Sequence, residues 1–472
     1  MGGRRKDGAE RERPRGGRSP RGGGPARQRP LRVRLPPGGR GGGEDALPHI
    51  RAARGRPLAR HGFLGAGSGM PGAHAADPLL RRLPRRPPRR GGGPGPPRRP
   101  ALPGVEMTDE RHFTPPPYLS YFLERYGRAR LDLASSGRPE RKWEELEPHL
   151  RGKPLYSPTY QEDARLFAET FSARYGLERD FGMLPVPGSS TANYLAVNAL
   201  VPPGGLAAVE SPVYDPVPYA VRASGRRVVE VPRPPSRGWS LDLEALEGAL
   251  REGARLVFLT NLHNPSGAFL DRETLMEADA LLARYGAWGL VDEIYLEFRR
   301  SWREETALAF TERFLVSSSL TKVYGLGGLK TGWLAGPREA VERCGEYWML
   351  VACNNPSPAF FAAAHLAPAL EGMLEADRPL LERNAALFRS WVEAVGLEPP
   401  LEAGSPLRLL ALPEGVNDLE LAERAYRDHG LFLAPGSFFG APGRIRVGLF
   451  KPTGVLEEGL DIVAGLLGGR FA

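Results

Sequence analysis

From residue 107 onward, short apolar runs alternate with stretches in which apolar residues recur at helical spacing. Asp271 is expected to cap a helix that ends near Tyr285, and residues 163–175 predict a second helix with three aromatic side chains spaced four apart. The runs that predict strands are 182–186, 206–209, 228–231, 256–259, 288–291 and 314–316. This alternation predicts a mostly parallel sheet with helices on its faces.

The pattern changes after about residue 345. A long helical stretch passes through 359–373 and 380–395, and short strand-like pieces follow at 407–412, 431–434 and 444–449. These elements predict a second, smaller α+β domain. The expected division has four parts: a disordered segment 1–106, an arm with part of the small domain 107–150, a large domain 151–345 and a small C-terminal domain 346–472.

The first 106 residues differ in composition from the rest. They are dominated by Arg, Gly and Pro, and they carry 25 Lys and Arg against 7 Asp and Glu, whereas the remainder carries 39 against 48. Such a segment buries too little apolar surface to offset chain entropy, so disorder is expected. Ordinary globular composition begins at Met107, and a start codon assigned too far upstream would produce this contrast.

Two other interpretations of the segment are open. An arginine-rich tail could bind nucleic acid, and a regulatory protein whose tail is the functional part is a second class of function. A targeting peptide is the other alternative, although such peptides are Ser-rich rather than full of Pro and Gly. Since the positive charge belongs to this segment alone, nucleic-acid binding by the acidic remainder is not expected.

Two further features limit the cellular setting. No run of about 18 apolar residues is present, so no membrane span is expected. Cys344 and Cys353 are the only cysteines, which provides no disulfide framework and fits a reducing, cytoplasmic setting.

Polar residues cluster directly after the predicted strands. In doubly wound sheets ligands bind beyond the carboxyl ends of the strands, so these residues are expected to meet at one site. The stretches are Gly188-Ser189-Ser190, Pro212-Val213-Tyr214, Asn264-Pro265-Ser266-Gly267, Asp292-Glu293-Ile294-Tyr295 and Ser317-Ser318-Ser319-Leu320-Thr321-Lys322. Each stretch alone has an ordinary structural explanation as a cap, a turn or a packing residue. Five in one sheet, in this order, favour a single functional site.

Together with Arg444-Ile445-Arg446, these stretches resemble the class I/II aminotransferase family, which has fold type I and uses pyridoxal 5′-phosphate (PLP). The resemblance covers roughly residues 131–450. It implies an α/β fold with a large domain, whose mostly parallel mixed sheet is flanked by helices, and a smaller α+β C-terminal domain. It also implies that no metal is required.

The resemblance assigns roles to the residues around the cofactor ring. Lys322 would form the Schiff base with the PLP aldehyde and later move the substrate's α-proton, which requires a lowered pKa. Asp292 would pair with the pyridine nitrogen, so that the ring can accept carbanion charge. Asn264 and Tyr295 would donate hydrogen bonds to the ring O3′, and Tyr214 would stack on the ring.

The same resemblance implies a phosphate site at Ser189, Ser190 and Ser319. The family usually has an arginine eight residues after the Schiff-base lysine, and this chain has Lys330 there. Lysine supplies a point charge without the guanidinium fork, so looser phosphate binding is expected. The glycines at 325, 327 and 328 are expected to let the chain approach the cofactor closely.

For the substrate, the resemblance implies that Arg446 binds the α-carboxylate. Arg444 lies on the same face of the predicted strand, so alternation alone does not separate the two. Gly137 resembles the family's substrate-side segment. Tyr156 resembles a tyrosine that reaches the phosphate of the neighbouring subunit, which implies a homodimer with shared sites; a structural tyrosine is the alternative.

The implied activity is a PLP-dependent aminotransferase that moves an amino group from an L-amino acid to a 2-oxo acid. A C–S β-lyase, a decarboxylase or another amino-acid lyase on the same fold shares the lysine chemistry and stays open as an alternative. Tyr118, Tyr121 and Phe438 hint at a partly apolar substrate pocket, although they are equally expected as packing residues.

Overall fold

The computed structural model describes residues 113–176 and 180–468. They all belong to one compact unit of the chain, Ala101–Ala472. The predictions for segment 1–106 fall outside the described residues. None of the described helices combines the length and the apolar composition that crossing a membrane requires.

Seven strands form the main sheet, in the order β2-β8-β7-β6-β5-β3-β4. Five of them, β4, β3, β5, β6 and β7, are parallel, and β8 runs antiparallel to both of its neighbours. The strands are β2 Gly182–Val186, β3 Leu206–Ser211, β4 Arg227–Pro232, β5 Ala254–Thr260, β6 Trp288–Asp292, β7 Phe314–Ser319 and β8 Gly332–Gly336. The carboxyl ends of the parallel strands therefore lie along one edge.

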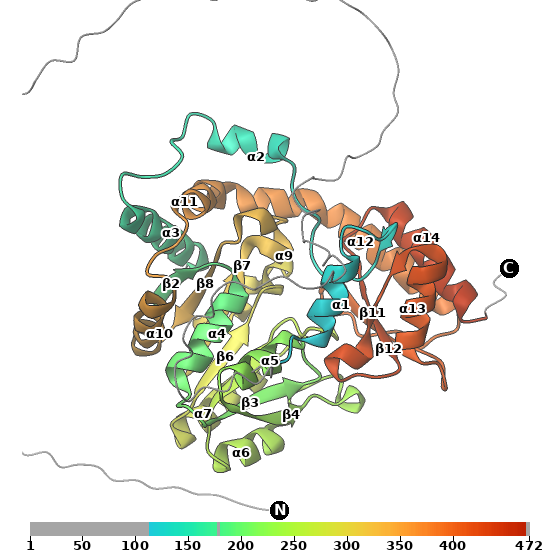
Figure 1. Cartoon of the computed structure of the whole chain (residues 1–472), viewed down its shortest axis with the longest axis horizontal. Helices are drawn as coiled ribbons and strands as arrows, with labels where there is room; N and C mark the ends of the chain where they lie inside the picture. The colour runs from blue at the N-terminus through green and yellow to red at the C-terminus, as the bar shows by residue number, and fades with distance from the viewer. Residues whose placement is uncertain (1–112, 177–179, 469–472) are drawn as a thin grey trace, which may run out of the picture. The chain divides into compact units, whose positions relative to one another are not determined.

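Helices cover both faces of this sheet (Figure 1). Because side chains alternate along a strand, Val257 and Leu259 of β5 pack on one face, whereas Leu256 and Phe258 pack on the other. The first face is covered by α3 Tyr160–Tyr175, α6 Leu243–Arg251, α7 Arg272–Tyr285 and α11 Ser357–Leu366. The second is covered by α4 Ser189–Leu200, α5 Pro216–Ala223 and α10 Arg338–Val351.

A smaller α+β region follows in the sequence and is drawn in orange and red (Figure 1). Its antiparallel sheet has the order β11-β12-β9, and a separate pair joins β1 to β10 in parallel. The strands are β1 Leu131–Asp132, β9 Leu407–Ala411, β10 Leu431–Phe432, β11 Ala434–Pro435 and β12 Arg444–Gly448. The helices are α12 Leu370–Ala394, α13 Asp418–His429 and α14 Thr453–Leu466.

The remaining α-helices of the described residues are short. They are α1 Pro117–Arg125, α2 Trp143–Leu150, α8 Trp302–Glu305 and α9 Leu320–Val323. Helix α1 packs beside β11 and β12 of the small region, through Tyr118 and its aromatic neighbours. The chain thus crosses from α1 and β1 to the large sheet near its start and returns to the small region near its end.

The predicted fold class and all six predicted strands of the main sheet are confirmed. Asp271 caps α7 as predicted, because its side chain accepts from the Thr274 N–H at 2.8 Å. The predicted helical stretch through 359–373 and 380–395 is present, and a 3₁₀ turn at Ala367–Ala369, which contains Pro368, divides it into α11 and α12. Helix α10 runs across the predicted boundary at 345/346, and the domain limits remain predictions.

Candidate active site

A cavity of about 280 Å³ opens where the carboxyl ends of the parallel strands meet the first turn of α4. Residues from β5, β6 and β7 line it together with α1, α5 and the loop after α9. The lining comprises Tyr118, Leu119, Phe122, Leu123, Ser136, Gly188, Ser189, Ser190, Asn193, Val197, Tyr214, Pro216, Val217, Ala220, Phe258, Thr260, Asn264, Asp292, Ile294, Tyr295, Ser319, Thr321, Lys322, Lys330 and Arg446. The lining thus combines charged and polar groups with apolar side chains.

The amino end of α4 forms one wall of the cavity. Gly188 precedes the helix with φ +80°, a conformation that favours glycine, and Ser189 and Ser190 form the first turn. Gly332 of β8 lies so close that a Cβ there would be 2.7 Å from the Cα of Gly188. With the ammonium of Lys330 next to Gly188, the free N–H groups of this turn make an anion-binding site.

Asp292 lies at the end of β6, in the floor of the cavity. Its Oδ2 accepts from the Asn193 side-chain amide at 2.8 Å, and the Asn193 Oδ1 in turn accepts from the Ser317 hydroxyl at 2.6 Å. Burial raises the pKa of Asp292 to about 6, while the hydrogen bond from Asn193 opposes that rise. The carboxylate is therefore positioned to hold a cationic group that enters the cavity.

Lys322 belongs to α9, directly after β7, and its side chain borders the cavity. Burial, together with the positive charges of Arg446, Lys330 and Lys451, lowers the pKa of its ammonium to about 8. A lysine with this pKa is partly neutral near pH 7.5, so its amine can act as a nucleophile or a base.

Arg446 of β12 reaches the cavity from the small region. Its guanidinium is 1% exposed, and it donates to Asn264 Oδ1 at 2.7 Å, Tyr118 Oη at 2.7 Å and the Ala134 carbonyl at 2.8 Å. Arg444 instead lies over the Trp239 ring, 5.3 Å from its centroid. The structure therefore separates two arginines that strand alternation leaves equivalent.

Two tyrosines, Tyr214 and Tyr295, also line the cavity. The Tyr295 hydroxyl donates to Ser136 Oγ at 2.8 Å and is buried, which raises its pKa to about 12. The half-buried Tyr214 meets the Tyr118 ring edge-on, with centroids 6.1 Å apart. Both hydroxyls are therefore neutral donors at physiological pH.

Ten of the predicted site residues line this one cavity: Ser189, Ser190, Tyr214, Asn264, Asp292, Tyr295, Ser319, Lys322, Lys330 and Arg446. Gly137 lies behind Lys322, where a Cβ would be 2.8 Å from the lysine Cα. Tyr156 is 55% exposed and does not border the cavity. Of the three aromatic residues suggested for a substrate pocket, Tyr118 lines the cavity, whereas Tyr121 and Phe438 pack beside it.

The interpretation of the loop glycines needs correction. Positions 325, 327 and 328 do not border the cavity. A Cβ at Gly325 would lie 2.4 Å from the Pro139 carbonyl oxygen, and one at Gly327 would lie 2.2 Å from Glu140 Oε1. These two glycines therefore admit residues 139 and 140, not the cofactor.

Asn193 and Ser136 carry polar contacts of the site that the sequence reasoning did not assign. Asn193 had a detectable signal, because it follows Ser189 by four residues and so shares its helix face. Ser136 belongs to the segment 133–137 that resembles the family's substrate side, but its contact to Tyr295, 159 residues away, could not be predicted.

Comparison with known proteins agrees with the fold and the cavity. Residues 154–463 match the family described as "Aminotransferase class I and II". Capreomycidine synthase of Streptomyces vinaceus is 29% identical over 370 residues, which are 75% of this chain and 93% of that protein. Arginine–pyruvate transaminase of Pseudomonas aeruginosa is 28% identical over 290 residues, 59% of this chain and 72% of that protein.

Solved structures show the same fold. A PLP-dependent aminotransferase from Streptococcus suis superposes with a TM-score of 0.67 at 23% identity, covering 75% of this chain and 97% of that one. A double mutant of Thermus thermophilus aspartate aminotransferase gives a TM-score of 0.64 at 23% identity, covering 74% and 95%. The fold and cavity define a fold type I enzyme. The chain belongs to the class I and II aminotransferase family, and it is a PLP-dependent aminotransferase.

The residues present fit this cofactor. A Cβ on Gly188 would lie 3.4 Å from the Lys330 side chain, so this glycine leaves room for a phosphate beside the ammonium, and Lys322 and Asp292 line the same cavity. In the described part of the chain, no three His, Cys, Asp or Glu side chains gather as metal ligands would.

Proposed function

We propose that Lys322 is the residue that holds PLP covalently and that its amine moves the proton during amino-group transfer. The observation that carries the proposal is the lowered pKa of Lys322 in the cavity that Asp292 also lines. When bound, PLP supplies an electron sink for the charge left on the substrate α-carbon. Once the substrate's amino group had replaced Lys322 on the cofactor, the freed, neutral Lys322 amine would take the α-proton, and its lowered pKa matches that task near neutral pH.

Asp292 keeps the pyridine nitrogen protonated in this proposal, and Asn193 holds the carboxylate in its ionised form. Asn264 and Tyr295 would hydrogen-bond the ring O3′. Tyr214 would stack on the ring. In a cavity of low polarity each of these contacts is stronger than it would be in water.

The phosphate is held by Ser189 and Ser190 at the start of α4, by the Ser319 hydroxyl and by Lys330. The helix N-terminus and the ammonium of Lys330 both favour a dianion. Because Lys330 makes a point contact rather than a bidentate one, Lys330→Arg is expected to tighten PLP binding. The dissociation constant of PLP in both proteins, measured by dialysis or fluorescence, tests this assignment.

Arg446 binds the α-carboxylate of the substrate, with Gly137 on the substrate side of Lys322. Guanidinium matches a carboxylate with two parallel hydrogen bonds. The contacts of Arg446 to Tyr118 and to the Ala134 carbonyl would hold the guanidinium in place, while the contact to Asn264 would be exchanged for the carboxylate.

We also propose that the preferred amino donor has an apolar side chain. Asp292 is the only carboxylate among the described lining residues, and the cofactor ring uses it. The three lining cations are assigned to the cofactor and the α-carboxylate. The remaining wall carries no charged side chain, and its apolar part comprises Leu119, Phe122, Leu123, Val197, Pro216, Val217, Ala220, Phe258 and Ile294. A charged substrate side chain would have no partner there.

The experiment incubates the PLP-loaded protein with single amino acids in the absence of any oxo acid. One equivalent of oxo acid per site, with conversion to the pyridoxamine form, is expected from leucine or phenylalanine, at least ~100-fold faster than from arginine or aspartate. Lys322→Ala is the inactive control. Release of ammonia with recovery of the starting spectrum would contradict amino-group transfer, and faster reaction with arginine would contradict the apolar preference.

A homodimer with shared sites is the assembly we propose. Leu155, Tyr156 and Leu350 are large apolar or aromatic side chains that are 70%, 55% and 83% exposed. Burial of such side chains is favourable, and Tyr156 would then reach the phosphate in the partner's cavity. We place the enzyme in the cytoplasm, since Cys344 and Cys353 are both free thiols.

A hybrid of two variants tests the shared site. One subunit carries Lys322→Ala and the other carries Tyr156→Ala. If Tyr156 serves the neighbouring site, the hybrid contains one site with both residues intact, and activity returns to about half of the wild-type value. If Tyr156 is only structural, mixing the two variants restores nothing.

A further inference from the structure

A strip of main chain, residues 137–141, lies along the loop that carries Lys322. The N–H of Arg138 donates to the Lys322 carbonyl at 2.8 Å, and the N–H of Arg141 donates to the Gly325 carbonyl at 2.8 Å. Gly137 packs against the Lys322 Cα with no space for a Cβ. The main chain of Lys322 is therefore fixed to this strip.

The glycine-rich loop after Lys322 is shaped to accept the strip. Gly325 and Gly327 leave room for Pro139 and Glu140, and Glu140 Oε2 accepts from the Gly328 N–H at 3.3 Å. The contact between the two segments thus continues for several residues beyond Lys322.

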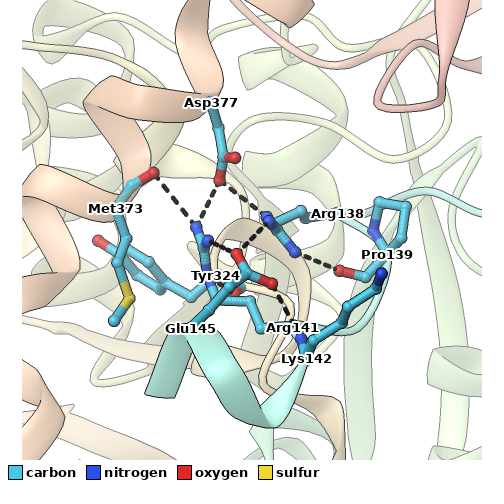
Figure 2. Close-up of polar contacts among 8 residues, drawn as sticks. All are labelled: Arg138, Pro139, Arg141, Lys142, Glu145, Tyr324, Met373 and Asp377. Carbon is cyan, nitrogen blue, oxygen red and sulfur yellow. Dashed lines mark hydrogen bonds and ion pairs between the residues drawn. The ribbon is translucent and has the colours of Figure 1, made fainter. Parts of the chain in front are cut away.

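Two arginines of the strip converge on one carboxylate of α12, as Figure 2 shows. Asp377 Oδ2 accepts from Arg138 Nε at 2.8 Å and from Arg141 Nη2 at 2.5 Å. Glu145 Oε1 accepts from the same two side chains, at 2.9 Å and 2.7 Å. The Arg141 side chain is 4% exposed and Asp377 is 13% exposed, so this pair is largely shielded from solvent.

Arg141 also contacts the lysine loop directly. Its Nε donates to the Tyr324 carbonyl at 2.9 Å, while Nη2 donates to the Met373 carbonyl of α12 at 3.2 Å. One guanidinium therefore joins the loop of Lys322 to the helix.

The same helix supports the other end of the site. Asn384, seven residues and about two turns after Asp377, donates to the carbonyls of Leu449 and Lys451, both at 2.8 Å. These residues follow β12, the strand of Arg446. One helix thus holds both the loop of Lys322 and the strand of Arg446.

From these contacts we propose that Asp377 is a positioning residue of the active site. Through Arg138 and Arg141 it holds strip 137–141, and the strip holds the main chain of Lys322. This inference rests on the proposed role of Lys322. Asp377 itself touches neither substrate nor cofactor.

The test uses Asp377→Asn, which keeps the size of the side chain and removes its charge. Because two arginines then lose a largely buried partner, the strip is expected to loosen. The matched control is Glu375→Gln, which removes a carboxylate from the same helix whose partners are Arg300 and Arg378.

The first readout is amide hydrogen exchange in the protein without cofactor, so it is independent of activity. The amides of Arg138 and Arg141 are expected to exchange at least 10-fold faster in Asp377→Asn and at the wild-type rate in Glu375→Gln. Unchanged exchange at both amides, or an equal acceleration of all amides across the described residues, would overturn the proposal.

The second readout uses the PLP-loaded enzyme. In Asp377→Asn we expect kcat to fall about 10-fold with KM within 2-fold, together with a shifted midpoint in the pH titration of the bound-PLP absorbance band. Asp377→Glu is expected to restore part of kcat. An unchanged pH midpoint and kcat would overturn the inference, whereas activity that persists in Lys322→Ala would instead refute the proposed function.

If Asp377→Asn does not fold, Arg138→Gln replaces it as the test variant. In Arg138→Gln the charge of Asp377 is still neutralised by Arg141, so a smaller loss of stability is expected. Faster exchange at the amide of residue 138 is expected in this variant, with a smaller effect at Arg141. Exchange at the wild-type rate at residue 138 would overturn the proposal.

Discussion

Two charged residues of the cavity, Asp292 and Lys322, have pKa values that are shifted toward the neutral form. Burial raises the pKa of Asp292 to about 6 and lowers that of Lys322 to about 8. Each shift has the same origin, the loss of hydration around a charge. Burial of these charges therefore lowers the free energy of unfolding, and a bound cofactor can offset this loss by pairing with them.

The cost at Lys322 leads to a prediction about stability. In the unfolded chain the lysine pKa is near its ordinary value of 10.5, against about 8 in the folded protein. Between these values the unfolded state binds more protons, so the free energy of unfolding rises with pH in that window. At pH 7 both states are charged, and the folded state bears a cost of roughly 3 kcal/mol.

Lys322→Met is therefore expected to stabilise the cofactor-free protein by roughly 3 kcal/mol at pH 7, with the advantage vanishing above about pH 10.5. Urea unfolding of both proteins at pH 7, 9 and 10.5 measures this difference. A stability difference that does not change with pH would contradict a lowered pKa at this lysine.

A second residue-scale prediction concerns Asn193. Its amide hydrogen bond favours the ionised form of Asp292, so Asn193→Ala raises the pKa of that carboxyl above about 6. We expect PLP to bind about 10-fold more weakly at pH 7, with a larger loss at pH 6. The dissociation constant of PLP between pH 6 and 8 checks this, with Asn198→Ala on the same helix as control. Equal losses at all pH values would contradict the assigned contact.

At the scale of elements, the sequence predicted the parallel strands because each is an apolar run bounded by turn residues. It did not predict β8, whose five residues Gly332–Gly336 begin and end with glycine and have no alternation. Position 332 requires glycine because Gly188 approaches it closely, and only the structure reveals this contact. Pro379 would also have predicted a break, yet α12 continues through it.

The packing of β8 against the start of α4 predicts opposite effects for two glycine substitutions. Alanine at Gly332 would place a Cβ 2.7 Å from both Gly188 Cα and the Ser318 carbonyl oxygen, and we expect a loss of roughly 1–3 kcal/mol. Alanine at Gly248 in α6 meets nothing within 4 Å, and a gain of about 0.5–1 kcal/mol is expected. Urea unfolding of the two variants tests the pair, and a stabilised Gly332→Ala would contradict the described contact.

At the scale of the whole described unit, the site joins residues that lie far apart in the chain. Tyr118 and Arg446 are 328 positions apart, and Arg141 and Asp377 are 236 apart. The sequence indicated Lys322, Asp292 and Arg446 because each lies in a recognisable motif. It could not indicate Asp377, because the sequence around a charged residue in a helix does not reveal which distant side chains it will contact.

The contact between Tyr118 and Arg446 provides a prediction at this scale. Tyr118→Phe removes the hydroxyl that accepts from the guanidinium at 2.7 Å, so Arg446 is held less firmly for the substrate carboxylate. We expect KM for the amino donor to rise about 10-fold with a smaller change in kcat.

Tyr121→Phe is the matched control, because it loses a hydroxyl from the same aromatic cluster whose partner is the Leu433 carbonyl. Steady-state kinetics of both variants separate the two contacts. An equal rise in KM for both variants would show that the effect comes from the cluster and not from Arg446.

The identity of the lysine that binds PLP underlies the whole mechanism, and it can be measured directly. Three lysines lie near the cavity, Lys322, Lys330 and Lys451, and burial lowers the pKa of both Lys322 and Lys451 to about 8. Borohydride reduction of the PLP-loaded protein, followed by peptide mass spectrometry, fixes the cofactor to the lysine that holds it. We expect the added mass on Lys322 alone. Its appearance on Lys330 or Lys451, or on no lysine, would contradict the mechanism.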